Sequence, residues 1–519
     1  MTPSQQDEAY SGRRLNRALK HFAVGRTIGL AIGLLWLLLL VRALDANDYA
    51  IYIALNGLLE IGVLGSSVGL IAALERYVPA LRIQWGLPAV YLFVRRLVVL
   101  RLAATLLFCS ALLTGSTLIG RSIGSPEIGD VLPLFCLIFL CEATCRFFET
   151  GFDSVLEQKR SQLSLLWRNC LRVLALIGAS VLLDGEVTLR GWLLIEGACS
   201  VASLLFTTTL FIAGQHQVGS ATEVEGVKPV VFDWSRIRRY SAPVYVAQFV
   251  GMLWGLEAAK VIGAKVLDGE LAAKFAFCIA LASVVQRYLP TVLLMGLIRP
   301  LFVAAAHHGR TTTTRVTFLF RIVLKLNLFI LTPAVVALVL VGDRLMLLAS
   351  GSRFADAGTT VAGLLLYITL LSTRTCHNLV LVTLEDGRTV LSALVAGLAV
   401  FFSAIALGLV DRTSLLISVL LAGELVAICV MRWAIKRHGG GASLPWISLG
   451  KLLVGGLAAW LAGSGVEYIF PATQAVFSDM VGCGISLGVY ALLCFFLKPF
   501  EQQERQSINR VLPAPIFVW

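Results

Sequence analysis

The stretch "FAVGRTIGLAIGLLWLLLLVRALDANDYAIYIALNGLLEIGVLG", residues 22–65, consists of two long apolar runs joined by a short polar turn. Each run has about twenty residues, the length of helix that crosses roughly 30 Å of hydrocarbon. In the turn, Asn47 and Asp48 are residue types that begin helices, because their side chains accept hydrogen bonds from free backbone N–H groups. The stretch therefore predicts two membrane-spanning helices joined by a tight turn.

The whole chain has the same character. Its 519 residues are 58% hydrophobic and 14% charged, with a mean hydropathy of +0.84, whereas soluble domains are about one quarter charged. The first apolar run is too long for a cleavable signal peptide, and no small-residue cleavage pattern follows it. The composition predicts an all-α polytopic membrane protein.

The net charge of +12 does not indicate a nucleic-acid partner. The basic residues lie in short segments between apolar runs, a distribution typical of membrane topology and of attraction to anionic lipid head groups. Most of the eleven cysteines lie inside apolar runs and none forms a CxxC pair. We therefore expect no metal site, no redox role and no nucleic-acid binding.

Apolar windows predict fourteen transmembrane helices. They cover residues 22–41, 48–73, 90–114, 128–150, 164–183, 190–213, 238–262, 271–297, 316–341, 357–384, 389–409, 413–434, 448–466 and 474–497.

The basic residues orient these spans. Most of the 43 Lys and Arg fall in alternate loops and span ends, which are expected to face the cytoplasm. The other loops hold Arg42, Arg121, Arg190, Lys260, Lys265, Lys274, Arg344, Arg353 and Arg412. Both termini, residues 1–21 and 498–519, are therefore expected to be cytoplasmic tails. The outer loops are all short, so no external catalytic domain is expected and the chain is not predicted to be an enzyme.

The polar turn recurs. "VRALDANDYAIY" (41–52) aligns with "AKVLDGELAAKF" (264–275), so that Arg42 matches Lys265, Asp45 matches Asp268 and Tyr52 matches Phe275. Either two polar turns coincide, or the chain carries a duplicated six-helix unit. Duplication predicts halves at 22–213 and 238–434, joined by a cytoplasmic linker at 214–237 and followed by two more helices within 435–497. An even number of spans per half predicts a pseudo-two-fold axis along the membrane normal.

Gly25-Arg26 begins the first apolar run, Arg42 and Leu44 precede the acidic turn, and Arg76, Tyr77 and Pro79 follow the second run. These motifs resemble those of the polysaccharide flippase family of the multidrug/oligosaccharidyl-lipid/polysaccharide exporter superfamily. The resemblance covers roughly residues 20–435. It rests on Gly25-Arg26, then Arg42, Leu44, Asp48 and Tyr49, then Gly69, Arg76, Tyr77 and Pro79, and on Ser241 and Pro243. The chain departs from the family at Glu257, where many members have Asp, and at Ala273 and Phe275. Its two additional C-terminal helices are similar to those of fourteen-helix members, the lipid II flippases.

The resemblance implies a transporter that flips an undecaprenyl-pyrophosphate-linked oligosaccharide, a repeat unit of exopolysaccharide or O-antigen, by alternating access. It implies a multi-pass protein of the bacterial inner membrane, whose partners include membrane lipids and the polysaccharide polymerase and export machinery. No cofactor is expected, although coupling to a proton or sodium gradient is compatible with the family.

Charges in the middle of a span are costly in lipid and therefore face protein or a polar cavity. Arginine suits phosphate because its planar fork binds two oxygens at once. The candidate substrate-binding residues are Arg26, Arg146, Arg287, Arg374 and His377, and the candidate coupling or structural acids are Glu60, Glu142, Glu257 and Glu424. For each, a structural role is the alternative: Glu142 and Arg146, four residues apart, also suit a self-neutralised pair.

Two other functions remain open. A cation-coupled exporter of small molecules has the same fold in this superfamily, but it favours an acidic cavity, whereas this chain places arginines in its spans. A membrane-embedded glycosyl polymerase or ligase generally needs a large external loop rich in Arg and His, which the sequence lacks.

Overall fold

The computed structural model describes residues 12–116, 127–182, 187–219, 232–287, 289, 311–351, 353–383, 386–410, 412–437, 445–469 and 475–511. Within these ranges all regular structure is helical and there is no strand. The prediction of an all-α polytopic membrane protein is confirmed.

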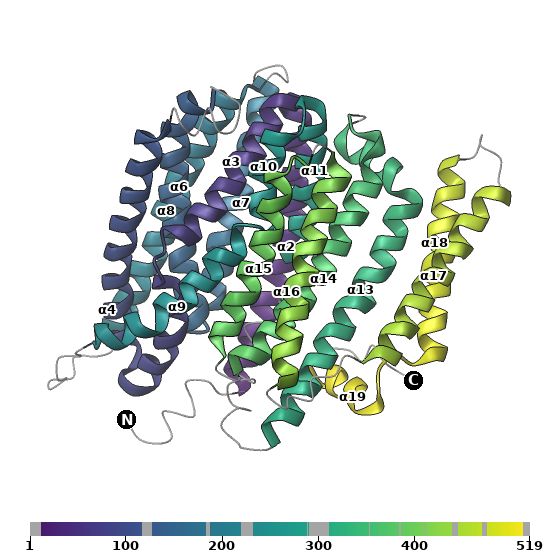
Figure 1. The fold of residues 1–519 in the computed structure, drawn as a ribbon. Coiled ribbons are helices and arrows are strands. Elements are labelled where there is room, and N and C mark those ends of the chain that lie inside the picture. Colours follow the sequence, from purple (N-terminus) through teal and green to yellow (C-terminus); the bar gives the residue numbers. More distant parts are fainter. Residues whose placement is uncertain are drawn as a thin grey trace. The chain divides into compact units, whose positions relative to one another are not determined.

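The chain forms two compact units, Met1–Phe277 and Cys278–Trp519. The helices before the boundary are α2 (Gly12–Ala43), α3 (Ala46–Gly65), α4 (Leu70–Thr114), α6 (Glu127–Ser154), α7 (Gln158–Leu182), α8 (Leu189–Gly219), α9 (Trp234–Met252) and α10 (Leu256–Val266). Helix α11 (Gly269–Arg287) contains the boundary. The later ones are α13 (Thr311–Ser350), the 3₁₀ turn η1 (Ala355–Ala357), α14 (Gly358–Thr383), α15 (Gly387–Ala406), α16 (Thr413–Arg437), α17 (Trp446–Ile469), α18 (Ala475–Leu497) and α19 (Gln502–Val511) (Figure 1).

In the described residues, thirteen helical segments are long and apolar enough to cross a membrane. The fourteenth expected span corresponds to α14, which has 26 residues at the predicted place but is less apolar because it carries Arg374, His377 and Asn378. Helix α14 packs against both α13 and α16. It therefore has protein neighbours for its polar side chains and need not be apolar on every side.

The turn between α2 and α3 forms as predicted, but its acids have different partners. Asp45, rather than Asn47 or Asp48, is the N-cap of α3, and its Oδ1 accepts the Asp48 N–H at 2.7 Å. Asp48 instead accepts the backbone N–H of Leu189 at 2.7 Å. Because Leu189 is the first residue of α8, one short turn caps two helices that are distant in sequence.

Two predicted spans are broken helices. The expected helix 48–73 is interrupted between α3 and α4, where Val68 has φ +45° and Gly69 has φ +83°. The expected helix 238–262 is interrupted between α9 and α10, at residues 253–255. The two spans pack against each other: the Tyr245 hydroxyl donates to the Gly65 carbonyl at 2.8 Å. A non-helical backbone at membrane depth is tolerated where protein surrounds it.

Gly57 lets α3 approach α10 closely. A Cβ atom added there would lie 2.6 Å from the Glu257 carbonyl oxygen, a backbone atom that has little freedom to move. We expect Gly57→Ala to cost about 1–3 kcal/mol of unfolding free energy through overpacking, measured by reversible unfolding in mixed micelles. Gly33→Ala on α2 is the control, because its Cβ would meet nothing within 4 Å. Equal stability of the two variants would contradict the close approach.

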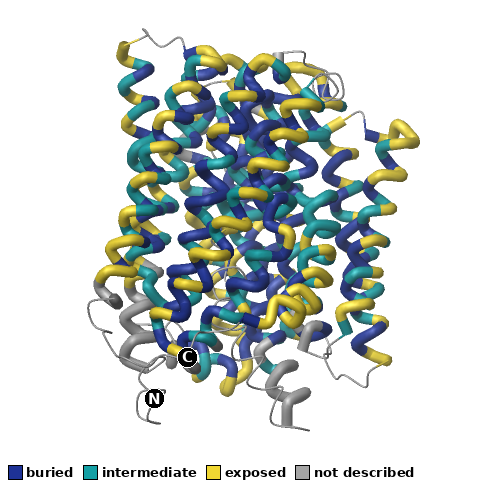
Figure 2. The backbone as a smooth tube through the Cα atoms, turned by 90° about the vertical axis from the view of Figure 1, so that its left-hand side faces the viewer, coloured by how far each residue is buried: buried dark blue, intermediate teal, exposed yellow. Residues whose placement is uncertain are grey.

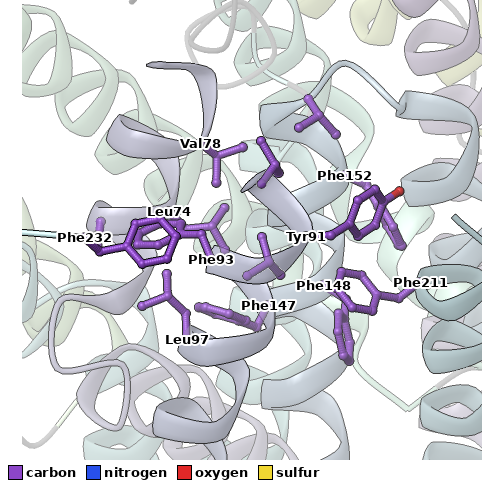
Figure 3. Packing of buried hydrophobic residues seen from close by; sticks show 14 of the residues in the cluster. Leu74, Val78, Tyr91, Phe93, Leu97, Phe147, Phe148, Phe152, Phe211 and Phe232 are labelled. Atoms are coloured by element: carbon purple, nitrogen blue, oxygen red, sulfur yellow. The ribbon is translucent and has the colours of Figure 1, made fainter. Parts of the chain in front are cut away.

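In the first unit, aromatic side chains of α4, α6 and α8 form a buried cluster with Phe232, which lies just before α9, and Ile237 of α9 (Figure 3). Phe211 of α8 contacts Tyr91 of α4 and Phe148 of α6, with ring centroids 5.2 and 4.9 Å apart. Along the helices, buried faces alternate with exposed ones (Figure 2). This cluster fixes α4 and the start of α9 in the first unit.

In the second unit, α13 has α17 and α18 packed along it (Figure 1). The short amphipathic helix α19 then packs on α13 through Ile508, which forms one cluster with Ile322 and with Phe500, just before α19. Lys325 of α13 is fully buried, and its Nζ lies 2.9 and 2.8 Å from the two carboxylate oxygens of Glu504. The sequence predicted no structure in this C-terminal tail.

Candidate functional site

The interior of the first unit contains a network of charged side chains, which we call the N-terminal charge cluster. It comprises Glu60 of α3, Glu142, Arg146 and Glu149 of α6, Arg168 and Arg172 of α7, and Glu196 of α8.

Glu142 lies at the centre of the cluster and is only 2% exposed. Its carboxylate lies 2.5 Å from Arg172 Nη2, 3.3 Å from Arg146 Nε and 3.5 Å from Arg168 Nε. Three guanidinium groups from two helices therefore share one buried carboxylate. Such a group is stable in a membrane only because each charge has partners.

The remaining acids complete the network. Arg146 Nη1 lies 2.6 Å from Glu60, Arg168 Nη1 lies 3.2 Å from Glu149, and Arg172 Nη2 lies 2.9 Å from Glu196. The Tyr52 hydroxyl also donates to Glu196, at 3.1 Å. The cluster thus joins α3, α6, α7 and α8 through ion pairs.

Arg101 of α4 lies near this cluster but belongs to no ion pair among the described residues. It is 0% exposed, its Nη2 donates to the Val63 carbonyl at 2.7 Å, and its charge faces that of Arg146. The cluster itself has four carboxylates and three guanidinium groups.

A cavity of about 20 Å³ adjoins the cluster, lined by Tyr52, Asn56, Glu142, Arg146, Arg172, Glu196 and five apolar side chains. A polar cavity of this size holds one water molecule. The cavity is too small for a sugar, so it can hold a water molecule or pass a proton but cannot bind a glycan. No group of three His, Cys, Asp or Glu within the described ranges is placed to hold a metal ion.

A smaller polar group lies in the second unit. Arg374 Nε of α14 lies 2.7 Å from Glu424 of α16, and the Tyr367 hydroxyl donates to the same carboxylate at 3.2 Å. One turn further along α14, His377 is fully buried, with Nδ1 2.8 Å from the Thr373 carbonyl and its ring against the edge of Phe320. The Arg374 guanidinium is therefore already paired with a carboxylate, that of Glu424.

The other predicted residues lie apart from these groups. Arg26 of α2 is partly exposed and lies within electrostatic range of Asp153. Glu257, in the first turn of α10, pairs with Lys260 at 2.6 Å. Arg287 is the last residue of α11 and is exposed. The structure thus brings together Glu60, Glu142 and Arg146 in one unit, and Arg374, His377 and Glu424 in the other.

Sequence reasoning missed Arg101, Arg168 and Arg172, which were grouped with the cytoplasmic span ends. Two signals were present. Arg168 and Arg172 are four residues apart, so they share a helix face with each other, and "LEQKRSQL" (156–163) recurs as "LEDGRTVL" (384–391). At the same offset, Arg146 matches Arg374 and Glu196 matches Glu424, each Arg preceding its Glu by 50 residues. The repeat therefore marked one Arg and one Glu of each buried group, but it did not mark Arg101, Arg168 or Arg172.

Comparisons with known proteins support the fold. No family model matches the sequence, and no curated protein is similar to it at a significant level. Among solved structures, "Lipid II flippase MurJ, inward closed conformation" superposes with a TM-score of 0.68 and 11% identity, over 92% of this chain and 98% of that one.

Two MATE structures are also similar, one of them described as a multidrug resistance transporter. An inward-facing MATE family transporter of the MOP superfamily gives a TM-score of 0.55 and 14% identity, over 79% of this chain and 94% of that one. A MATE in the bent conformation gives a TM-score of 0.53 and 16% identity, over 82% and 97%. At these identities the likeness establishes the arrangement of helices: this chain has the fold of the MOP superfamily transporters.

Proposed function

We propose that the chain is a flippase for a lipid-linked, anionic oligosaccharide, moving its head group across the membrane by alternating access. The observation that carries the proposal is the extent of the fold. The similarity to the lipid II flippase covers 92% of this chain, against 79% and 82% for the two MATE structures. The two additional helices α17 and α18 support the same class of substrate.

The charges inside the helices also support an anionic substrate. The first unit carries four arginines in the interior of its spans, Arg101, Arg146, Arg168 and Arg172, and the second carries Arg374. Cationic side chains in a membrane interior mark pathways for anions or pair with acids. In this proposal, Arg374 exchanges Glu424 for the pyrophosphate, and Arg26 and Arg287 are proposed as separate contacts for the head group.

The proposal places the protein in the bacterial inner membrane, with both termini in the cytoplasm, acting with a polysaccharide polymerase and export machinery. The substrate is an undecaprenyl-pyrophosphate-linked repeat unit. A proton or sodium gradient drives the cycle, with Glu60, Glu142, Glu257 and Glu424 as the acids available for coupling. The water-sized cavity beside Glu142 and Glu196 suits the exchange of a proton, so this proposal favours a proton over a sodium ion.

The test is a flipping assay in proteoliposomes with a fluorescent undecaprenyl-pyrophosphate-linked oligosaccharide, read by quenching of the outer leaflet. Arg287→Ala combined with Arg374→Ala is expected to abolish flipping, and Arg412→Ala, an exposed arginine at the start of α16, is the control. Because Arg374→Ala leaves Glu424 buried and unpaired, the variant R374Q/E424Q, which removes both charges, is compared for folding.

Two outcomes would reject parts of the proposal. Full flipping by the double alanine variant would reject the assigned arginines. No flipping by the wild type, together with gradient-driven uptake of a cationic fluorophore, would favour a small-molecule exporter of the same fold.

A further inference from the structure

Six exposed arginines lie on α4 and α9, two helices of the first unit that pack against each other, and we call them the arginine ledge. They are Arg76, Arg95 and Arg96 of α4 and Arg236, Arg238 and Arg239 of α9. We infer that the ledge is a docking site for the diphosphate head group of a lipid in the inner leaflet, occupied before the lipid reaches the transport pathway. This inference rests on the proposed function and names the first contact of its substrate.

Ring contacts and a hydrogen bond hold the three chain segments of the ledge together. Tyr77 and Tyr240 meet edge to face at 6.1 Å, and the Tyr77 hydroxyl donates to the Arg236 carbonyl at 3.3 Å. The Arg96 guanidinium lies over the ring of Phe232, with its Cζ 5.2 Å from the ring centroid. The segments that carry Arg76, Arg96 and Arg236 therefore pack together.

Acids do not neutralise this surface. Within the described residues, none of the six arginines forms an ion pair. Asp233, the acid adjacent to α9, accepts the backbone N–H of Arg236 at 3.0 Å and so serves as the helix cap. Arginine forks with no carboxylate partner suit a ligand with several phosphate oxygens, which they bind in pairs.

The ledge is placed at a membrane surface. It lies at the beginning of two apolar spans, Trp85–Thr114 and Trp234–Val266, which have 30 and 33 residues. About twenty residues cross the hydrocarbon, so the arginine-bearing ends of both spans extend into the head-group region. Trp85, Trp234 and Tyr240 are exposed beside the arginines, and such aromatic residues are typical of that region.

The ledge adjoins both breaks, which connects it to the transport pathway: α4 begins directly after the interruption that follows α3, and α9 ends at the interruption before α10. The interruption after α3 contacts α9, where a Cβ at Gly69 would lie 2.9 Å from the Ser241 carbonyl oxygen. Discontinuous helices commonly line substrate sites in transporters. A diphosphate lipid is therefore favoured over a bulk phospholipid, because the ledge lies at the start of these helices.

The test uses the full-length protein in phosphatidylcholine nanodiscs, with binding of undecaprenyl diphosphate measured at equilibrium. The variant R76Q/R96Q/R236Q is expected to bind it about tenfold more weakly or worse, and binding by the wild type is expected to weaken with salt because the arginines are exposed. The control R190Q/K265Q/R412Q removes the same charge from exposed positions elsewhere and is expected to bind as the wild type does.

Phosphatidylglycerol at the same mole fraction is expected not to displace the diphosphate lipid. Equal affinity of the ledge variant and the wild type would overturn the inference. Equally effective displacement by phosphatidylglycerol would also overturn it and make the ledge a general contact for anionic lipids. If the wild type binds the diphosphate lipid through the ledge but flips no lipid-linked oligosaccharide, the proposed function fails and the docking site stands.

Discussion

Replacement of Glu142 by glutamine is expected to destabilise the first unit more than any other single change in the N-terminal charge cluster. Glu142 is the carboxylate that Arg146, Arg168 and Arg172 share at 2.5–3.5 Å. Without its charge, Arg146, Arg168 and Arg172 each keep one acid, Glu60, Glu149 or Glu196, but they lose the central carboxylate that offsets the repulsion among the three guanidinium groups. Removal of one member of a buried ion pair costs about 3–5 kcal/mol, and we expect a loss at least in that range.

Asp130→Asn is the matched control, because it removes an acid from the same helix at an exposed position. Its unfolding free energy is expected to stay within about 0.5 kcal/mol of the wild type. Both variants are compared by reversible unfolding in mixed micelles. If the Glu142→Gln variant has the same unfolding free energy as the wild type, the cluster does not hold α6 and α7 together.

The second large effect is expected at the junction of α13 and α19. Glu504→Gln leaves the fully buried ammonium of Lys325 without its counter-charge, because both Glu504 oxygens lie within 3 Å of Nζ. We expect a cost of about 3–5 kcal/mol and release of α19 from α13. Hydrogen exchange of the backbone amides of residues 502–511 measures that release directly.

Glu501→Gln is the control for this junction, since Glu501 is exposed and contributes its backbone N–H to Glu504 at 2.8 Å. The double variant K325M/E504L removes both charges and is expected to recover most of the stability, because apolar residues of similar size replace buried ion pairs at little cost. Slow exchange of α19 in the Glu504→Gln variant would show that Phe500 and Ile508 hold the helix without the ion pair.

The positions of the spans were predictable from the sequence. Apolar length is a local property, and thirteen expected spans coincide with apolar helices while α14 lies where the fourteenth was expected. The breaks within two spans were not predicted. Apolar windows continue across Ser66–Gly69 and across residues 253–255, and hydropathy does not report backbone dihedral angles.

The candidate residues were predictable in part. Glu142 with Arg146 follows from helical spacing, since residues four apart share a face. The partner of Arg146 on α3, Glu60, is 86 residues away in sequence, and no local pattern identifies it. Arg168 and Arg172 looked like cytoplasmic charges because they are near the start of a span, yet burial against α6 makes them part of the cluster.

The sequence by itself determined that this protein is a bundle of membrane-spanning helices, because the length and composition of each apolar run decide whether that run enters lipid. The tertiary structure decided which charges become partners. Glu504 meets Lys325 across 179 residues and Glu196 meets Tyr52 across 144. Such pairs depend on the register in which distant helices pack, and packing register is a property of the folded chain.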